Sequence, residues 1–336
     1  LMIGLRRGLV RGARISSLGV HVPERVLTNA EISRSLDTSD EWIATRTGIR
    51  ERRIARADEA TSDLAEIAAR RCLEAAAVDP AALDLVIVTT ISPDHMMPAT
   101  ASIVCERIGA VRAGAFDIQA GCTGFVYGLA TATAFVAANI YTNVLVLGAE
   151  VLSKILDWED RATCVLFGDG AGAVLVQPTD NGSIFSFDLG NDGSGAPFLN
   201  IPAGGTRQPA TFETVRDREH TMHMTGSEVF KFATRTVVES CEKVLGDAGI
   251  GVADVDLFVP HQANIRIIES AARWLGFHEA QVFANLDRYG NTSCASIPIC
   301  LHEASEKGRL KTGDTLLMAG FGAGLTWGSC LTRWEL

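Results

Sequence analysis

The sequence predicts an α/β fold in which two duplicated halves stack as five layers, α/β/α/β/α. Two landmarks recur about half a chain length apart and at nearly the same offset. Residues 84–88 (DLVIV) resemble residues 256–259 (DLFV), and residues 145–149 (LVLGA) resemble residues 316–320 (LLMAG). Short runs of β-branched residues between helical segments predict parallel sheets with helices on both faces. We therefore expect two sheets, one from each half.

Each half repeats one order of elements. A helix leads to a buried strand, a second helix ends at a glycine, and a short strand and a glycine turn lead to a third helix and a last apolar strand. Two short helices are expected earlier in the chain, because residues 28–31 and 38–41 have the spacing of a capping box. The longer helices are expected over residues 63–77, 98–109 and 123–139 in the first half, and over residues 227–247, 264–276 and 293–305 in the second.

The duplication divides the chain into three predicted parts. Residues 1–176 form an N-terminal half that carries a candidate nucleophilic cysteine, and residues 227–336 form a C-terminal half that carries a histidine and an asparagine. The part between them, residues 177–226, matches neither half, and residues 177–223 are rich in Gly, Pro, Asp and Thr. We expect this part to be an irregular insertion that contributes a substrate surface.

The composition of the 336 residues excludes several classes of protein. Asp and Glu number 40 and Lys and Arg number 30, so the net charge is −10, and 47% of the residues are hydrophobic. A disordered or low-complexity chain has fewer apolar residues than this. The negative charge argues against nucleic acid as the main ligand, because phosphates are bound by surplus Lys and Arg.

No targeting segment and no membrane segment is expected. Residues 1–14 contain several arginines but no apolar run, unlike a signal peptide. The uncharged stretch at residues 118–149 contains Gly, Thr and Asn, and it divides into turn, helix and strand rather than one membrane span. The cysteines include no C-x-x-C pair, which indicates reduced core thiols in a cytoplasmic protein. The histidines lack the spacing of a metal site.

Three polar side chains at predicted turns are candidates for catalysis. Cys122 lies between a strand and a helix, where the positive end of the helix dipole favours the thiolate. His261 directly follows an apolar strand, at the strand end where α/β proteins place their sites. Asn291 lies at a predicted strand–turn–helix that the duplication makes equivalent to the turn of Cys122. A cysteine or a histidine alone is more often structural, but the three together form a nucleophile with two hydrogen-bond donors.

Two glycine-rich runs differ in what they predict. Residues 168–172 (GDGAG) lack the G-x-G-x-x-G spacing of a dinucleotide site, and strand-like residues lie on both sides of them. Residues 319–328 (AGFGAGLTWG) can bring backbone N–H groups against a substrate oxygen. The spacing of Trp42, Arg46 and Arg50 suits a nucleotide clamp, but it is more often that of an ordinary surface helix.

These motifs resemble those of β-ketoacyl-acyl-carrier-protein synthase III, a family of the thiolase superfamily. They occur in family order over almost the whole chain. The resemblance implies a homodimer with the thiolase fold that initiates fatty-acid synthesis. The segments that carry it are residues 38–52, 120–125, 160–173, 261–266, 290–293 and 320–328.

The resemblance implies a condensation in two steps. Cys122 attacks an acyl-CoA primer and becomes acylated, and the backbone N–H groups of Cys122 and Ala323 form the oxyanion hole for this step. His261 and Asn291 then hydrogen-bond the thioester carbonyl of malonyl-acyl-carrier protein and stabilise the enolate that forms as CO2 leaves. No cofactor is implied, because the CoA thioester is itself the substrate.

The resemblance also assigns residues to three binding surfaces. Trp42 and Arg161 are expected to sandwich the CoA adenine. Met97 occupies a position where the family often has Phe from the partner subunit, and a flexible Met suits a longer or branched primer. For Lys231 and Arg273, a role in docking the carrier protein and an ordinary place on the solvated surface are equally good interpretations. The assigned residues are Thr38, Trp42, Arg46, Arg161 and Asn264 for CoA, Met97 and Phe321 for the primer, and Lys231, Arg266 and Arg273 for carrier-protein docking.

Three other functions remain open at this point. Residues 92–95 and 148–154 resemble quinolone-type synthases of specialised metabolism, which use malonyl-CoA as extender. A cysteine hydrolase would pass the acyl group from Cys122 to water. A non-catalytic acyl-CoA binding protein would not need the thiol. The sequence alone identifies neither the primer nor the pathway.

Overall fold

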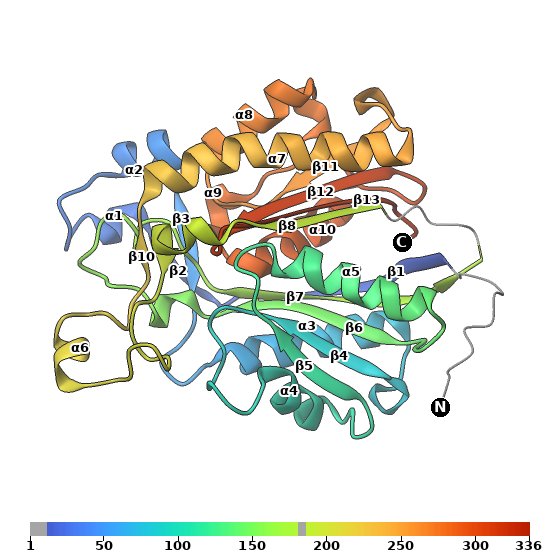
Figure 1. Cartoon of the computed structure of the whole chain (residues 1–336), viewed down its shortest axis with the longest axis horizontal. Coiled ribbons are helices and arrows are strands. Elements are labelled where there is room, and N and C mark those ends of the chain that lie inside the picture. The colour runs from blue at the N-terminus through green and yellow to red at the C-terminus, as the bar shows by residue number, and fades with distance from the viewer. Residues whose placement is uncertain (1–11, 181–185) are drawn as a thin grey trace.

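The structure is a computed structural model that describes residues 12–180 and 186–336. Two large β-sheets alternate with three layers of helices, so the order of layers is α/β/α/β/α (Figure 1). The first sheet is built from strands within residues 12–179, and the second from strands within residues 186–333. The predicted fold class is confirmed.

The first sheet has five strands in the order β1-β7-β6-β4-β5. Strand β4 pairs in parallel with β5 and β6, whereas β7 pairs antiparallel with β6 and β1. All residues of β4 and β6 are buried, because helices cover both faces of the sheet. The strands are β1 (Gly12–His21), β4 (Leu85–Thr89), β5 (Gly114–Ile118), β6 (Val144–Glu150) and β7 (Gly170–Thr179).

The second sheet has four strands in the order β11-β12-β13-β8. They are β8 (Ser186–Asn191), β11 (Leu257–Pro260), β12 (Thr315–Gly322) and β13 (Thr326–Arg333). The irregular insertion predicted over residues 177–226 is therefore too wide. Its first residues complete β7, and β8 pairs along β13 as an edge strand of the second sheet. The sequence pattern did not predict β8, because its segment is rich in turn-forming residues. Pairing with β13, rather than local propensity, defines this strand.

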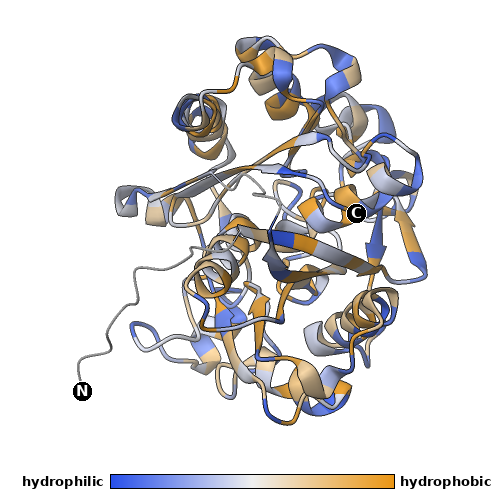
Figure 2. Cartoon of the chain, turned by 90° about the vertical axis from the view of Figure 1, so that its right-hand side faces the viewer, coloured by the Kyte–Doolittle hydropathy of each residue, from blue (hydrophilic) through white to orange (hydrophobic). Residues whose placement is uncertain are grey.

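The long helices form the outer and middle layers of the stack. Their bounds agree with the predicted ones to within a few residues. Figure 2 shows hydrophobic residues concentrated on the strands and the helices beside them. In the part of the chain that the structure describes, no helix is both long and apolar enough to span a bilayer. Helices α3 (Thr61–Ala76) and α4 (Thr100–Ile108) cover the first sheet, α7 (Gly226–Ala248) and α8 (Ile265–Leu275) cover the second, and α5 (Gly124–Ala137) and α10 (Ser296–Glu306) lie between the sheets.

Shorter elements occupy one end of the stack, where several of them border the site. The predicted capping box at Thr28 and Glu31 is confirmed. The second one is wrong by one position, because Ser39 caps the next helix by accepting the N–H of Trp42. The short elements are β2 (Arg25–Thr28), α1 (Asn29–Ile32), α2 (Asp40–Thr47), β3 (Glu51–Ile54), β9 (Leu199–Asn200), α6 (Phe212–Arg216), β10 (His223–Met224) and α9 (Leu286–Tyr289).

Candidate active site

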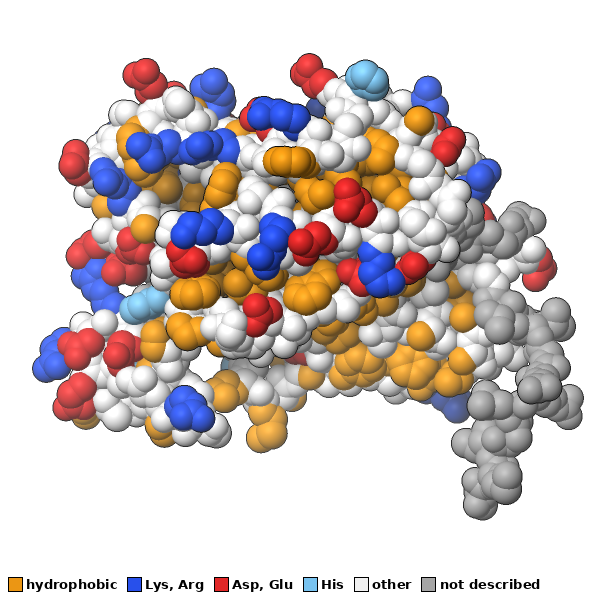
Figure 3. Space-filling model, turned by 45° about the horizontal axis from the view of Figure 1, so that its top comes forward, with side chains coloured by type: hydrophobic (Ala, Val, Ile, Leu, Met, Phe, Trp, Pro, Cys, Tyr) orange, Lys and Arg blue, Asp and Glu red, His pale blue; other side chains and the backbone are white. Residues whose placement is uncertain are grey.

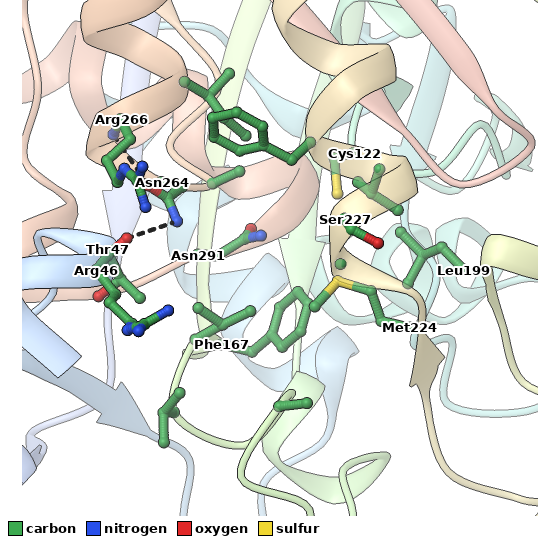
Figure 4. Close-up of a pocket in the computed structure, with 18 of the residues that line it drawn as sticks. Arg46, Thr47, Cys122, Phe167, Leu199, Met224, Ser227, Asn264, Arg266 and Asn291 are labelled. Atoms are coloured by element: carbon green, nitrogen blue, oxygen red, sulfur yellow. Dashed lines mark hydrogen bonds between the residues drawn. The ribbon is translucent and has the colours of Figure 1, made fainter. Parts of the chain in front are cut away.

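Cys122, His261 and Asn291 line one cavity of about 500 Å³, and we call these three residues the floor of the cavity. Figure 4 shows Cys122 and Asn291 among the residues that line it. All three are buried, with 2 to 6% of each residue exposed. They come from different parts of the fold: the turn between β5 and α5, the carboxyl end of β11, and the turn after α9. The strand predicted before Asn291 is instead the short helix α9, and a single β-bridge joins Asn291 to Phe167.

Cys122 lies at a tight contact between two backbone turns. A Cβ atom added at Gly121 would lie 2.5 Å from the backbone nitrogen of Ala323, and one added at Gly322 would lie 2.3 Å from that of Cys122. Only glycine allows the two turns to approach so closely. The contact brings the two backbone nitrogens expected for an oxyanion hole to the same place.

Burial raises the pKa of the Cys122 thiol to about 12, so the thiol keeps its proton at neutral pH. The predicted effect of the helix N-terminus is present in the geometry, because α5 begins two residues later. Burial acts against this effect, because it disfavours the charged thiolate. Attack by this sulfur therefore needs a proton acceptor.

His261 is a neutral ring that is held at one nitrogen. Its Nδ1 lies 2.7 Å from the hydroxyl oxygen of Ser296, and its ring meets the edge of Phe321 at 5.4 Å between centroids. Burial lowers the pKa of His261 to about 3. The buried Nε2 has no partner among the described residues. When the Ser296 hydroxyl donates to Nδ1, the ring hydrogen is on Nε2, and that nitrogen donates to a bound oxygen.

Asn291 is oriented by the backbone around it. Its side-chain oxygen accepts the N–H of Ser293 at 2.8 Å, which leaves the Nδ2 amide to donate elsewhere. Its own N–H donates to the carbonyl of Leu166 at 2.8 Å, and its carbonyl accepts the N–H of Gly168 at 3.0 Å. The floor of the cavity therefore offers a thiol and two side-chain hydrogen-bond donors on a rigid frame.

At the other end of the cavity, three side chains form what we call the mouth: Trp42, Arg46 and Arg161. The guanidinium carbons of Arg46 and Arg161 lie 5.1 Å and 4.8 Å from the centre of the Trp42 ring. Asn264 also lines the cavity, and its amide donates to the carbonyl of Arg46 at 3.2 Å (Figure 4). Flat cationic and aromatic groups of this kind suit a nucleotide base and its phosphates.

The remaining predicted residues divide between the cavity and the surface. Phe321 and Arg266 line the cavity, whereas Thr38 and Met97 do not. Met97 is 86% exposed in the single chain. Figure 3 shows Lys and Arg side chains among hydrophobic and acidic ones on the face of α7 and α8. Lys231 of α7 and Arg273 of α8 are exposed there, and Lys231 forms an ion pair with Glu228 at 2.7 Å.

A second hollow of about 370 Å³ adjoins the Cys122 turn, because Gly121 and Ala323 line it. Its apolar wall is formed by Ile91, Leu199 and Met222, none of which the sequence reasoning singled out. These residues carry no local signal, because each resembles any other core residue. Ser293 and Ser296 were also missed, although they belong to the polar run that follows Asn291.

Models of one protein family match two parts of the chain. The model described as "3-Oxoacyl-[acyl-carrier-protein (ACP)] synthase III" matches residues 116–193. The model of the C-terminal part of the same protein matches residues 245–334. The two matches contain Cys122, His261 and Asn291, so the floor of the cavity lies within them.

Curated relatives match the chain over nearly its full length. A β-ketoacyl-[acyl-carrier-protein] synthase III from Desulfitobacterium hafniense is 54% identical over 322 residues, which are 96% of this chain and 97% of that protein. The protein of the same name from Clostridioides difficile is 49% identical over 324 residues, 96% of this chain and 99% of that one.

Solved structures agree with these relatives. The 3-oxoacyl-[acyl-carrier-protein] synthase III of Aquifex aeolicus has a TM-score of 0.90 and 45% identity, covering 96% of this chain and 100% of that one. The priming β-ketosynthase of the R1128 polyketide pathway has a TM-score of 0.91 and 37% identity, covering 99% of each chain. OleA from Xanthomonas campestris, at 22% identity and a TM-score of 0.84, shares the fold.

Proposed function

This chain belongs to the 3-oxoacyl-[acyl-carrier-protein] synthase III family, and from that premise we propose that Cys122, His261 and Asn291 carry out its reaction. The protein has the thiolase fold. It is an acyltransferase that condenses an acyl-CoA primer with malonyl-acyl-carrier protein in fatty-acid synthesis. A quinolone-type enzyme of specialised metabolism is not favoured, because the curated relatives share the name β-ketoacyl-[acyl-carrier-protein] synthase III.

In the first step, the sulfur of Cys122 attacks the thioester carbonyl of the primer. The negative charge that develops on the carbonyl oxygen is stabilised by the backbone N–H groups of Cys122 and Ala323. The contact between the turns of Gly121 and Gly322 supports this role, because it fixes both nitrogens before the substrate arrives. The acyl chain extends into the second hollow, whose wall is apolar.

In the second step, the malonyl thioester carbonyl binds at the floor of the cavity. Nε2 of His261 and Nδ2 of Asn291 donate to this oxygen and stabilise the enolate as CO2 leaves. The neutral state of His261 supports a donor role, because a pKa of about 3 makes the ring a weak base. The enolate carbon then attacks the acyl group on Cys122, and the thiolate of Cys122 leaves.

The mouth of the cavity binds CoA, with the adenine between Trp42 and Arg161 and the phosphates near Arg46. Asn264 holds the backbone of Arg46 and so supports this end of the site. Thr38 is part of the same proposal, although it lies outside the cavity lining. No cofactor takes part besides the CoA thioester, which is consumed as a substrate.

Lys231, Arg266 and Arg273 form the docking surface for the acidic carrier protein. Their place on the exposed face of α7 and α8 supports this role, because opposite charges steer two proteins together. A carrier protein docked there presents its malonyl thioester to the cavity, because Arg266 also lines the cavity.

The working enzyme is a homodimer in which Met97 of each chain completes the primer site of the other. The exposure of Met96 and Met97 supports this proposal, because two neighbouring apolar side chains favour burial against a second chain. A flexible Met at that place admits a longer or branched primer. We locate the enzyme in the cytoplasm, where its eight free and buried cysteines stay reduced.

The convergence of Cys122, His261 and Asn291 on one cavity carries the proposal. Its test is mass spectrometry of the protein incubated with a panel of acyl-CoA primers. An acyl adduct on Cys122 that only malonyl-acyl-carrier protein removes is the expected result, and Cys122→Ala removes both adduct and turnover. An adduct lost to water alone identifies a hydrolase, and full activity of Cys122→Ala contradicts covalent catalysis.

A further inference from the structure

A fully buried carboxylate lies behind the nucleophile. Glu150 ends strand β6 with 0% of the residue exposed. Its oxygens accept the hydroxyls of Thr90 and Ser92 and the N–H groups of Ile91 and Ser92, at 2.6 to 3.2 Å. No Lys, Arg or His among the described residues forms an ion pair with it. A buried charge held by dipoles alone is costly to keep, which points to a use for it.

The sheet topology places this carboxylate at the same edge of the first sheet as Cys122. Strands β6, β4 and β5 are neighbours and run parallel, so their carboxyl ends share one edge of the sheet. Glu150 ends β6, and Cys122 follows β5 at the same edge. The turn before α10 fills the space between them. The carbonyl of Cys294 in that turn lies 2.1 Å from a Cβ atom added at Gly148, and the Cys294 thiol donates to the carbonyl of Gly121 at 3.1 Å.

Ser293, in the same turn, connects the carboxylate to the floor of the cavity. Its backbone is held at a φ of +46°, a left-handed conformation that is rare for residues other than glycine. Its N–H donates to the side-chain oxygen of Asn291. Its hydroxyl donates to the sulfur of Cys294 at 3.8 Å, and hydrogen bonding to this hydroxyl lowers the pKa of both Cys122 and Glu150.

The electrostatics leave Glu150 as the stronger base in this site. Burial lowers the pKa of His261 to about 3, so its ring does not take the thiol proton readily. Burial raises the pKa of Glu150 above its usual value, which makes this carboxylate a better proton acceptor than an exposed one. The titratable groups that face Glu150 are the thiols of Cys122 and Cys294, from the turns before α5 and α10. Both thiols are buried and neutral.

We propose that Glu150 holds the proton of Cys122 while the acyl group occupies the sulfur, and that the Ser293 hydroxyl passes this proton between them. The inference rests on the proposed function and adds a proton acceptor to it. In the first step the S–H bond of Cys122 breaks, an O–H bond forms on Glu150, and the sulfur bonds the acyl carbon. The C–S bond to CoA breaks, and solvent protonates the CoA thiolate. In the second step Cys122 leaves as a thiolate and takes its proton back from Glu150.

The test is the rate at which iodoacetamide alkylates Cys122 in the full chain, followed by mass spectrometry between pH 6 and pH 9. This probe needs no acyl substrate, so a failure of the proposed function shows separately as absent turnover of the wild type. We expect the wild-type rate to level off near neutral pH. In Glu150→Gln we expect a rate about 100-fold lower at pH 7 that rises about tenfold per pH unit, because only hydroxide then takes the proton.

Two further variants keep the inference falsifiable. Ser293→Ala removes the connecting hydroxyl and leaves the carboxylate, so it is expected to reproduce the pH slope of Glu150→Gln even if that variant folds poorly. Asp169→Asn is the matched control. Asp169 is equally buried, but it accepts hydrogen bonds from Ala55 and Ser153, away from Cys122. Its substitution is expected to leave the pH slope unchanged.

The sign of the effect separates a proton acceptor from a mere neighbouring charge. A negative charge near Cys122 raises the pKa of the thiol. If Glu150 acts only through its charge, Glu150→Gln lowers that pKa and alkylation becomes faster. A rate in Glu150→Gln that equals or exceeds the wild-type rate at pH 7 overturns the inference.

Discussion

At the floor of the cavity, Cys122, His261 and Asn291 are buried, whereas at the mouth Arg46 and Arg161 are exposed to solvent. Burial shifts the pKa of both titratable floor residues, raising that of Cys122 and lowering that of His261. The two ends of one cavity therefore have different physical properties. The floor acts through hydrogen bonds in a dry environment, and the mouth acts through stacking and charge in water.

This difference predicts that floor substitutions change the rate of the chemical step and mouth substitutions change substrate affinity. A donor in a dry site stabilises developing charge strongly, because the low dielectric leaves it unscreened. Exposed cations are screened by salt and contribute less. Two variants test this distinction, and a third tests the burial on which it depends; they are given in decreasing order of expected effect.

Asn291→Asp is expected to have the largest effect. The substitution keeps an oxygen for the N–H of Ser293 but replaces the Nδ2 donor with an acceptor. We expect the decarboxylation of malonyl-acyl-carrier protein to slow by about 100- to 1,000-fold, the usual loss for one oxyanion-hole donor. Acylation of Cys122 is expected to stay within a fewfold of wild type, as measured by single-turnover mass spectrometry. An equal loss in both steps would contradict separate donor sets for them.

His261 is expected to make folding stability depend on pH. Its folded pKa is about 3, and an unfolded histidine titrates near 6.5, so the unfolded chain binds one more proton between these values. Stability is therefore lost as pH falls below 6.5. We expect His261→Asn, measured by urea unfolding from pH 7.5 to pH 4.5, to lack this loss of about 1.4 kcal/mol per pH unit. The contributions of other titrating groups cancel when the two stability curves are subtracted, because both proteins contain those groups. Parallel curves for the two proteins would show that His261 has the same pKa in the folded and the unfolded chain.

Trp42→Ala is expected to have the smallest effect of the three. It removes the aromatic face on which Arg46 and Arg161 lie. We expect the KM for acyl-CoA to rise by roughly tenfold, equivalent to about 1.4 kcal/mol, with kcat unchanged. Trp158→Ala is the control, because Trp158 is partly exposed and lies outside the cavity. A fall in kcat without a change in KM would show that Trp42 acts on the chemical step, as the floor residues are expected to do.

Much of the fold could be predicted from local patterns. Helices α3 and α5 end close to their predicted bounds, because apolar spacing and a terminating turn are encoded within a few residues. Strand β8 could not be predicted, because half of its definition lies in β13, more than a hundred positions away. The same limit affected the turn of Asn291, where the short helix α9 stands in place of the expected strand and a bridge joins Asn291 to Phe167.

The site divides in the same way. Cys122, His261 and Asn291 could be selected because each stands at a glycine-rich or polar turn next to an apolar strand or helix. Ile91, Leu199 and Met222 could not, because their role depends on which wall of a hollow they face. Glu150 could be noted only as part of the motif at residues 148–154. Its proposed role as a proton acceptor depends on neighbours after β4 and in the turn before α10, which are distant in the sequence.

The order of amino acids specifies the alternation of helices and strands, the duplication, and the kinds of side chain available for chemistry. These properties depend on spacing along the chain, which propensity and apolar periodicity record directly. The protonation of those side chains, by contrast, depends on how the chain folds around them. The pKa values of Cys122 and His261 depend on how completely other segments exclude water, and no residue near them in the chain determines that.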